Sequence, residues 1–530
     1  MNFKFYERKE ETGILNTLFQ NRKQSTLIGI DGKRRTGKTV FTIKYIQDKT
    51  LELTERNQKV CFLNFIGNPS FNSRENIINS LEVIKEFYKQ ETDLNLFKYN
   101  YNYNWREFFS YLKEIIEHLR ENDYFIFIFF DEISWYDKKN MFIQQFANFW
   151  NTYGHIQDEK LWVFLASSAS IWMRNKVFEN ENSFYNRITR KIKIEPFSFQ
   201  QIKEYVKMKT NLNQINDEYL LKYYMMFGGI IKYYDYIDFK FKTFEENIEI
   251  LIKNENFFLK EYDILFKGLV ANENSIKSID LHKKIIDILC KKKSAKFDEI
   301  KKQLSEKISD SLIYMCLNEL ENCDMIRISD KDFGGVKQYN INDPFCYFYY
   351  YWINNKTKKQ DLKNIIKLDK YYTTWLGSAF EIMIFQKNNL RDILETKTLD
   401  DYTTRLNWKT QSKQIDILLE RKTIESNKKR NFILLELKCY KDEISFGSKD
   451  IKELESKAIE VISNFRKFDK NNIKTDVFVN IKLISLYKIN FLEKIITNSN
   501  ISYENIYLII ANGFNHTCTI FSTKYSRTSH

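Results

Sequence analysis

The segment STLIGIDGKRRTGKTVFTIKYIQ, residues 25–47, decides the fold of the first part of the chain. Gly32, four further residues and then Gly37, Lys38 and Thr39 match the pattern GxxxxGK[ST] completely. Residues 25–31 alternate as a strand does, and residues 40–47 continue as a helix. Backbone N–H groups of such a loop converge on a polyphosphate at the start of the helix. The segment therefore predicts a phosphate-binding loop, in which Lys38 contacts the β- and γ-phosphates of ATP and Thr39 ligates Mg²⁺.

The stretch YFIFIFFDEIS, residues 124–134, supplies the acidic partner that such a loop requires. Its first seven residues are all apolar, which is typical of a parallel strand buried on both faces. We expect Asp131 to bind Mg²⁺ and Glu132 to polarise the attacking water as general base. An isolated Asp-Glu pair after a strand is more often a cap or a turn. The loop upstream favours the catalytic interpretation.

Two further segments contain candidates for contact with the nucleotide. The stretch LWVFLASS ends in Ser167 and Ser168, where a hydroxyl can sense the γ-phosphate or, equally well, cap the next turn. Arg187 and Arg190 stand just before another predicted strand. Either of them can act as an arginine finger, and the alternative is a pair of solvated arginines on a basic face.

The composition sets the broader class of the protein. The chain has 530 residues, of which 43% are hydrophobic, so three or four domains are expected. A net charge of +13 makes DNA a plausible partner, although a Lys-rich composition also arises from an AT-rich genome. Seven cysteines without a CxxC pair and five histidines indicate neither a disulfide framework nor a zinc site. With no signal peptide and no apolar run long enough for a membrane span, we expect a soluble, cytoplasmic protein without a membrane partner.

Six blocks of the N-terminal part resemble the archaeal-type ATPases, a branch of the STAND and AAA-like P-loop NTPases: FYERKEE, GKRRTGKT, FFDEIS, LASSAS, FYNRITRKIKIEPFS and MMFGGIIKYY. The resemblance implies an ATPase core over residues 1–197 and a helical lid over residues 198–275 packed on that core. It also places Arg8 of the opening block near the nucleotide. Where the family has a proline after the Gly-Gly pair, this chain has Ile230 and Ile231.

The middle of the chain predicts a winged-helix domain over residues 276–344, with three amphipathic helices followed by two strands. The third helix is more acidic than basic, which favours an interaction or spacer role over direct DNA readout. Residues 345–374 are expected to form a helical connector. Its aromatic run FCYFYYYWINN, residues 345–355, has no cation before Lys356, so packing is favoured over the stacking of bases.

Near the C-terminal end, FILLELKC, residues 432–439, is a buried strand interrupted by Glu436 and Lys438 on one face. An isolated pair of this kind is usually a salt bridge at a sheet edge. Here the preceding strand, QIDILLE, carries Asp416, and together the three residues form the PD-(D/E)XK nuclease pattern. Asp416 and Glu436 would bind Mg²⁺ or Mn²⁺, and Lys438 would orient water or stabilise the phosphate.

Residues 375–530 resemble the nuclease-like domain that is commonly attached to archaeal-type ATPases, on the blocks GSAFE, QIDILLE and LLELKCY. The resemblance implies that Glu381 adds to the metal site, against the alternative of an ordinary surface carboxylate. Lys457, on the helix that follows, is a candidate phosphate contact or a solvated lysine. The expected fold is a multidomain α/β protein: a P-loop NTPase sheet with a helical lid, a winged helix and a restriction-endonuclease-like domain.

The resulting hypothesis is an ATPase, with a homo-oligomer as one candidate assembly, whose nucleotide state controls a magnesium-dependent DNase domain. The main alternative is a non-catalytic switch that binds nucleic acid or protein without cleaving it. A DNA-translocating motor is a third hypothesis.

Overall fold

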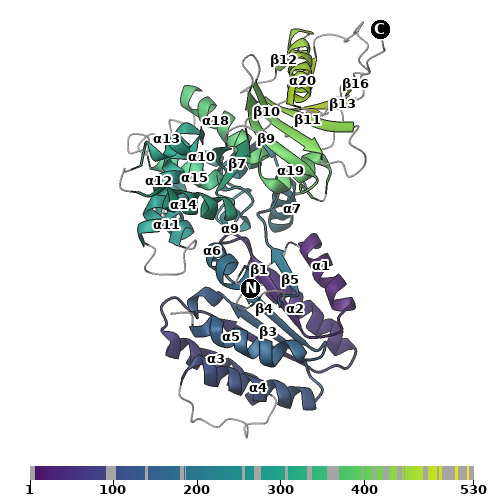
Figure 1. Cartoon of the computed structure of the whole chain (residues 1–530), viewed down its shortest axis with the longest axis vertical. Helices are drawn as coiled ribbons and strands as arrows, with labels where there is room; N and C mark the ends of the chain where they lie inside the picture. The colour runs from purple at the N-terminus through teal and green to yellow at the C-terminus, as the bar shows by residue number, and fades with distance from the viewer. Residues whose placement is uncertain are drawn as a thin grey trace. The chain divides into compact units, whose positions relative to one another are not determined.

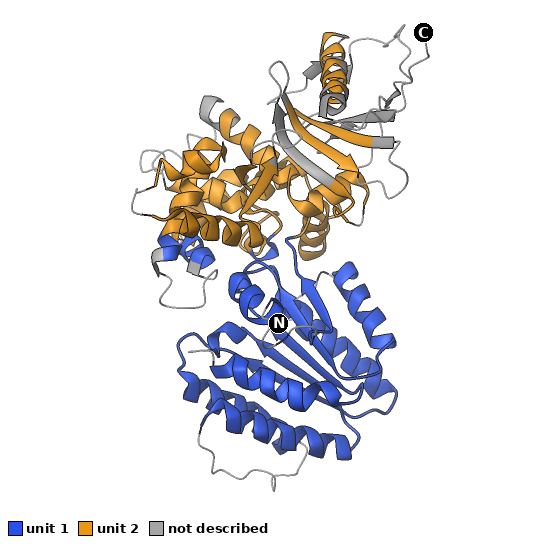
Figure 2. Ribbon diagram, viewed as in Figure 1, with its two compact units in different colours: residues 1–196, 230–232, 260–280 blue, residues 197–229, 233–259, 281–530 orange. Residues whose placement is uncertain are grey.

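The structure is a computed structural model, and it forms two compact units (Figure 2). Unit 1 comprises Met1–Pro196, Ile230–Lys232 and Lys260–Asp280, and unit 2 comprises Phe197–Gly229, Tyr233–Leu259 and Leu281–His530. The structure describes residues 6, 8–90, 103–137, 141–179, 184, 187–253, 257–267, 276–304, 308–330, 337–354, 369–396, 398–409, 414–421, 429–438, 444–446, 448–468, 476–485, 489–491, 508–510 and 522–524.

Unit 1 is built on a five-stranded sheet with the order β2-β3-β4-β1-β5, in which every neighbouring pair is parallel (Figure 1). The strands are β1 (Thr26–Asp31), β2 (Val60–Ile66), β3 (Phe125–Asp131), β4 (Leu161–Ala166) and β5 (Arg190–Lys193). Because parallel strands all end at one edge, the segments that follow β1, β3 and β4 meet there. The predicted α/β class and the parallel sheet of a P-loop NTPase core are confirmed.

Helices cover both faces of this sheet. On one face lie α1 (Lys9–Gln20) and α2 (Lys38–Glu55), and on the other lie α3 (Ser73–Gln90), α4 (Trp105–Glu121) and α5 (Met141–Thr152). Strand β3 is apolar up to its last residue, Asp131, because it contributes to both cores. Phe125, Phe127 and Phe129 pack with α1 and α2, whereas Ile126 and Ile128 face the other helices. Short helical turns connect these elements: Ile133–Trp135 follows β3, Gly154–Ile156 follows α5, and α6 (Ser170–Met173) and the π-helical turn Arg174–Phe178 follow β4.

The range predicted as a lid is helical, with α7 (Phe199–Thr210), α8 (Asp217–Phe227), α9 (Ile231–Tyr234), α10 (Phe244–Lys253) and α11 (Phe257–Lys267). Helix α7 begins with a capping box, in which Ser198 and Gln201 each bind the other's backbone N–H through their side chains. Helices α7, α8 and α10 fall in unit 2, whereas Lys260–Lys267 of α11 belong to unit 1 together with the phosphate-binding loop, so the range predicted as a lid is divided between the two units.

Three helices and a small antiparallel sheet follow, in the order predicted for a winged helix. The helices are α12 (Ile276–Lys292), α13 (Phe297–Lys301) and α14 (Asp310–Asn322), and the sheet has the order β6-β8-β7. Its strands are β6 (Ser294–Ala295), β7 (Ile326–Asp330) and β8 (Lys337–Ile341). The aromatic run then forms α15 (Pro344–Phe348) and a π-helical turn, η7 (Tyr349–Ile353).

The last part of unit 2 begins with α18 (Asp369–Ile384) and α19 (Lys387–Leu394) and contains a mixed sheet of order β15-β13-β11-β10-β9. Its strands are β9 (Tyr402–Lys409), β10 (Gln414–Arg421), β11 (Lys429–Lys438), β13 (Asp476–Ser485) and β15 (Leu508–Ile510), with β16 (Ser522–Lys524) beside β13. Strands β9, β10 and β11 are antiparallel, whereas β11 and β13 run parallel, with α20 (Ser448–Phe468) between them in the chain. A separate pair joins β12 (Ile444–Phe446) to β14 (Ile489–Phe491).

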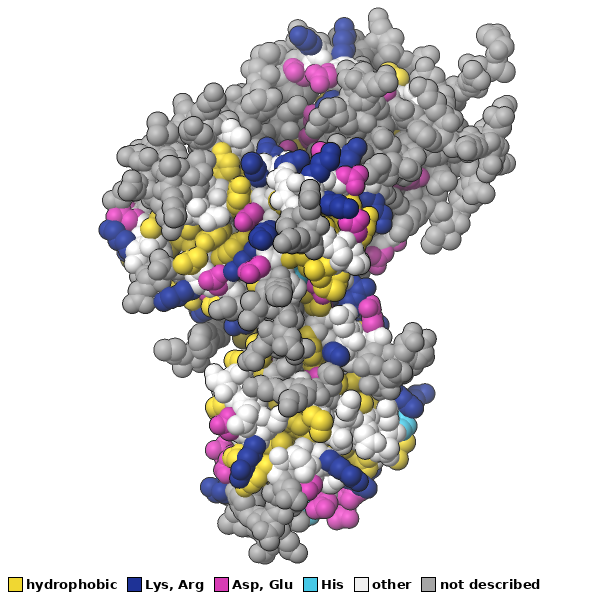
Figure 3. Space-filling model, turned by 60° about the vertical axis from the view of Figure 1, so that its left-hand side comes forward, with side chains coloured by type: hydrophobic (Ala, Val, Ile, Leu, Met, Phe, Trp, Pro, Cys, Tyr) yellow, Lys and Arg dark blue, Asp and Glu magenta, His cyan; other side chains and the backbone are white. Residues whose placement is uncertain are grey.

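Charged side chains of both signs are interspersed on the described surface. In the view of Figure 3, Lys and Arg side chains stand beside Asp and Glu side chains, so the net charge of +13 forms no single-sign field on the described part of this face. An argument for nucleic-acid binding must therefore come from local sites. None of the described helices has the length and apolar character that crossing a membrane requires.

Candidate nucleotide and metal sites

The loop between β1 and α2 has the backbone that a phosphate cradle requires. Gly32 and Gly37 both lie at positive φ, +145° and +93°, where a side chain would strain the backbone. A Cβ atom on Gly32 would also come within 2.3 Å of the Ile194 carbonyl oxygen. Lys38 begins α2 with its side chain buried, and its Nζ donates to the carbonyl oxygens of Gly32 and Lys33 at 2.7 and 2.9 Å. The amine is thus held inside the loop.

Carboxylates surround that amine. Burial lowers the pKa of Lys38, and the negative charges of Glu132, Asp31 and Asp131 oppose this shift. The cluster lies where α2 begins, so the partial positive charge of the helix N-terminus adds to the positive side chain. Together they form a site for an anion.

Thr39 and Asp131 meet at the edge of the sheet, as their predicted roles require. Thr39 Oγ1 donates to Asp131 Oδ2 at 2.6 Å, and the backbone N–H of Glu132 donates to Asp131 Oδ1 at 2.9 Å. Burial, together with the negative charge of the neighbouring Glu132, raises the pKa of Asp131 to about 6. A hydroxyl and a buried carboxylate at this distance are oxygen donors of the kind that Mg²⁺ prefers, so the residues fit the predicted ion.

Glu132 is fixed by the end of β4, the strand between β1 and β3. Its Oε2 accepts hydrogen bonds from the backbone N–H and the hydroxyl of Ser168, at 3.0 and 2.7 Å. Its backbone is left-handed, with φ at +50°, a conformation that costs a non-glycine residue about 1 kcal/mol. The carboxylate predicted as general base therefore has a defined orientation.

The serines after β4 hold the turn that follows the strand. Ser167, for which a contact with the γ-phosphate and a cap of the next turn were both predicted, is buried, donates to Ser134 Oγ at 2.9 Å and accepts from the Ala169 N–H at 3.1 Å. Ser168 holds Glu132, and Ser170 Oγ donates to the Gly32 carbonyl oxygen in the loop at 3.2 Å. Ser170 had no signal in the sequence apart from the run of small polar residues in LASSAS.

Arg8 braces the phosphate loop from outside. Its guanidinium is buried and donates to the backbone carbonyl oxygens of Thr36 and Glu195 at 2.7 and 2.9 Å, and it pairs with Glu11 at 3.2 Å. The opening block, which was predicted to lie near the nucleotide, therefore contacts the backbone of the phosphate loop. Arg35, next to Thr36 in the loop, forms an ion pair with Glu261 at 2.6 Å.

Replacing Arg8 with Lys should weaken ATP binding by about tenfold, because a point charge cannot hold both carbonyl groups as the planar guanidinium does. Titration calorimetry on the full chain measures the change in Kd. Lys9→Ala, at the exposed neighbouring position, is the matched control and should bind like the wild type. Equal affinity of the Arg8→Lys protein and the wild type would remove the bracing role.

Arg187 lies away from the loop in its own chain. It is exposed and stands three residues before β5, where Thr189 N–H donates to the Leu27 carbonyl oxygen at the start of β1. The loop follows the other end of β1. Since β1 and β5 are parallel, Arg187 lies toward the opposite edge of the sheet from Gly32, and its role as an arginine finger stays a prediction.

A second acidic site lies in unit 2. The register that pairs Ile417 with Leu435 places Asp416 and Glu436 at the next position along β10 and β11. Asp416 Oδ2 accepts a hydrogen bond from the Leu437 N–H at 2.8 Å. Burial raises the pKa of Asp416 to about 7, and the nearby carboxylate of Glu436 adds to that shift. Two carboxylates at one buried position form a candidate metal site.

Lys457 completes this cluster. Its Nζ pairs with Glu436 Oε1 at 2.6 Å, and both side chains are buried. The sequence left Lys457 as a phosphate contact or a solvated lysine, and the structure shows a buried ion pair. Lys438 ends β11 beside Ser485 of β13. Its side chain lies outside the described residues, so its proposed role stays a prediction.

Glu381 belongs to the same electrostatic neighbourhood. It projects from α18, and burial raises its pKa, against the opposing charges of Lys293 and Arg327. Its negative charge also raises the pKa of Asp416. The structure therefore brings Glu381 close to Asp416, with Glu436 and Lys457 beside them, and does not leave it as an ordinary surface carboxylate.

Comparisons with known proteins show remote similarity. No family model matches the chain. An uncharacterised protein of Methanocaldococcus jannaschii is 23% identical over 388 residues, which cover 71% of this chain and 75% of that protein. Among solved structures, a Walker-type ATPase of Pyrococcus abyssi is 17% identical with a TM-score of 0.44, covering 65% of this chain and 96% of that one. The ORC2 protein of Aeropyrum pernix, solved with ADPNP and ADP, is 10% identical with a TM-score of 0.44, covering 65% and 92%.

Proposed function

We propose that this chain is a P-loop ATPase whose nucleotide state controls a magnesium-dependent nuclease domain. The observation that carries the proposal is the buried ion pair of Glu436 and Lys457 next to the half-buried Asp416 and Glu381, on a chain that also carries the candidate nucleotide site. Buried carboxylates are costly to ionise unless they pair or bind a cation, so their concentration at one place favours a functional site over a structural one.

In the nucleotide site, each chain residue has one task. The loop N–H groups and Lys38 hold the phosphates, and Thr39 with Asp131 would hold Mg²⁺. Glu132, oriented by Ser168, accepts a proton from the attacking water at its carboxylate. When bound, Mg²⁺ neutralises charge on the phosphate oxygens and polarises water at either site.

In the nuclease-like site, Asp416 and Glu436 would hold the divalent cation, which can be Mg²⁺ or Mn²⁺. Lys457 holds the carboxylate of Glu436 in place, because the two are in direct contact inside the protein. Glu381 adds negative charge from α18. Lys438 is assigned the contact with the phosphate on the pattern of the sequence.

One observation supports control of the nuclease-like site by the nucleotide site: unit 2 contains both helices α7 and α8 of the predicted lid and the acidic cluster. Asn389 of α19 accepts from the Phe199 N–H of α7 at 2.7 Å, and Tyr224 of α8 donates to the Phe197 carbonyl oxygen at 2.7 Å. Helix α8 also packs against α18, which carries Glu381. A change in the lid would therefore act on the helix at the metal site.

The second candidate is a switch that binds nucleic acid without cleaving it. The ion pair between Lys457 and Glu436 favours it, because a cation must compete with the lysine for that carboxylate oxygen. DNA binding without cleavage in Mg²⁺ and in Mn²⁺ is the result that distinguishes it from the nuclease.

Plasmid cleavage by the full chain tests the proposal. We expect nicking in Mg²⁺ or Mn²⁺ whose rate changes when ATP is added, and we expect Lys38→Ala to remove that ATP dependence. Lys44→Ala, which loses an exposed lysine of the same helix, is the control. Absence of cleavage under all of these conditions would rule out the nuclease, and cleavage at one rate with and without ATP would rule out the control by nucleotide.

A further inference from the structure

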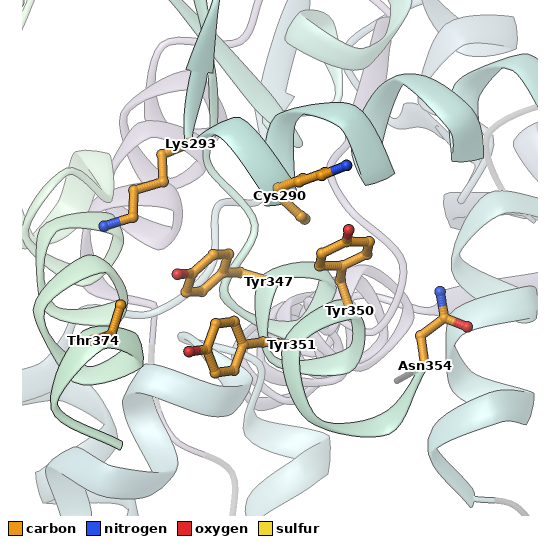
Figure 4. Close-up of a pocket in the computed structure, with 8 residues that line it drawn as sticks. Cys290, Lys293, Tyr347, Tyr350, Tyr351, Asn354 and Thr374 are labelled. Carbon is orange, nitrogen blue, oxygen red and sulfur yellow. The ribbon is translucent and has the colours of Figure 1, made fainter. Parts of the chain in front are cut away.

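Unit 2 contains a pocket that neither the nucleotide site nor the carboxylate cluster uses. It has a volume of about 370 Å³, and eight residues line it (Figure 4). They come from the end of α12, from the aromatic run of α15 and η7, and from α18. This volume is at the lower end of the range of small-molecule pockets and has room for a nucleobase.

Three tyrosines of the aromatic run give the pocket flat apolar walls. Tyr347 lies on α15, and Tyr350 and Tyr351 lie on the π-helical turn η7. The rings of Tyr347 and Tyr351 are 6.0 Å apart, and in Figure 4 their hydroxyl groups point to the side where Lys293 and Thr374 lie. π-Helical turns are rare and occur frequently at functional sites. Tyr347 is buried, whereas Tyr350 and Tyr351 are half-buried, and the faces of these two rings can stack against a base.

The cations of this pocket come from another part of the chain. Lys291 and Lys293, at the end of α12, line it together with the tyrosines, and no acidic residue is among the eight described lining residues. For the aromatic run, packing was favoured over the stacking of bases, since no cation precedes Lys356 in it. Folding supplies the missing charge from α12, which the sequence of the run could not show.

Lys293 occupies a position that ordinarily belongs to glycine. Its φ is +67°, and its N–H donates to the Leu289 carbonyl oxygen at 2.7 Å, closing the C-terminus of α12. Glycine and asparagine are preferred in this left-handed conformation, and other residues cost about 1 kcal/mol. A lysine that lines a pocket from a left-handed backbone position, where glycine would be less strained, indicates a role for its charge.

The pocket adjoins the acidic cluster. Thr374, which lines the pocket, lies two turns before Glu381 on α18, and the charge of Lys293 opposes the rise that burial causes in the pKa of Glu381. Glu381 is near Asp416 as well. A ligand held by the tyrosines and lysines would therefore lie beside the carboxylates proposed to bind metal.

We propose that this pocket binds one nucleotide of a single-stranded nucleic acid, with its base against the tyrosines and its phosphate at Lys291 and Lys293. A base in a duplex has both faces covered by its neighbours, so only an unstacked base can enter such a pocket. That the bound strand is the one to be cleaved rests on the proposed function. Binding itself does not depend on it.

Fluorescence anisotropy of a labelled oligothymidylate of about fifteen nucleotides, with the full chain in EDTA, tests the proposal. We expect single strands to bind more tightly than a duplex of the same length. Lys293→Gly should weaken binding about tenfold and reduce its salt dependence, and Tyr351→Ala should weaken it by about tenfold or more. Lys293→Gly also relieves the left-handed strain, so its melting temperature should hold or rise. Lys292→Ala, which loses an exposed charge of the same helix end, is the matched control.

The outcomes separate this pocket from the proposed function. The proposal that the pocket binds a single strand would be overturned by either of two results. One is wild-type affinity for the oligonucleotide in both Lys293→Gly and Tyr351→Ala, and the other is equal affinity for duplex and single strand. Displacement of the oligonucleotide by thymidine monophosphate at similar concentration would show that the site binds a free nucleotide, and the proposal of a nucleic-acid strand as the ligand would be wrong. Single-strand binding that needs Lys293, in a chain that never cleaves, would leave the pocket standing and remove the nuclease.

Discussion

Glu132→Gln is expected to lower the rate of ATP hydrolysis by about two to four orders of magnitude while ATP binding persists. Glutamine has the same shape, and its side-chain oxygen can still accept from the N–H and hydroxyl of Ser168, which hold Glu132 at 3.0 and 2.7 Å. It cannot accept a proton from water. The mutation therefore removes the base and preserves the geometry. Phosphate release under saturating ATP measures the rate, and titration calorimetry measures the affinity.

Two further variants locate the effect. Glu10→Gln, the same change at an exposed position of α1, should hydrolyse ATP like the wild type. Ser168→Ala removes only the hydroxyl donor and should cost less than Glu132→Gln, because the backbone N–H still holds the carboxylate. Rapid hydrolysis by Glu132→Gln would assign the base to another residue.

Much of the nucleotide site could be predicted because its parts are local in sequence. The glycines, Lys38 and Thr39 lie within one loop, and the apolar run before Asp131 shows that its strand is buried on both faces. The meeting of Thr39 with Asp131 then follows from two parallel strands that end at one edge.

The residues that the sequence did not place depend on the order of the strands and on the turns after them. Strand β4 inserts between β1 and β3, and the turn that follows it decides which serine reaches Glu132. Strand β5 joins β1 on its outer side in parallel, which carries Arg187 toward the edge opposite the loop. Neither fact is contained in a local motif.

In unit 2 the positions of the functional lysines likewise could not be predicted from local motifs. Asp416 and Glu436 could be found because they interrupt apolar strands, where a charge is conspicuous. Lys457 lies on a helix with many other charges, and only the packing of α20 against the sheet shows that it is the buried partner of Glu436. Lys291 and Lys293 reach the tyrosines in the same non-local way.

Asp416→Asn should abolish metal-dependent cleavage, with a loss of about a thousandfold or more, since the variant removes a charged ligand of the cation. It should also remove the rise in melting temperature that Mg²⁺ or Mn²⁺ produces in the wild type. Asparagine can still accept the hydrogen bond that the Leu437 N–H donates to Asp416 at 2.8 Å, so the strand pairing should survive. Asp401→Asn, at an exposed position just before β9, is the control and should behave like the wild type in both measurements.

The same variant has an opposite effect on stability in EDTA. The folded pKa of Asp416 is about 7 against an ordinary value of 3.8, so its contribution to stability is present at low pH and is lost as pH rises from about 4 to about 7. The neutral asparagine side chain of the variant would carry no such penalty. The free energy of unfolding of the wild type should therefore fall below that of the variant over this range and stay lower by a constant amount above it. Urea titrations at pH 5, 6, 7 and 8 measure the difference. Equal free energies of unfolding for the wild type and the variant at pH 8 would show that burial and the charge of Glu436 do not raise the pKa of Asp416. The metal site would then lose its electrostatic basis.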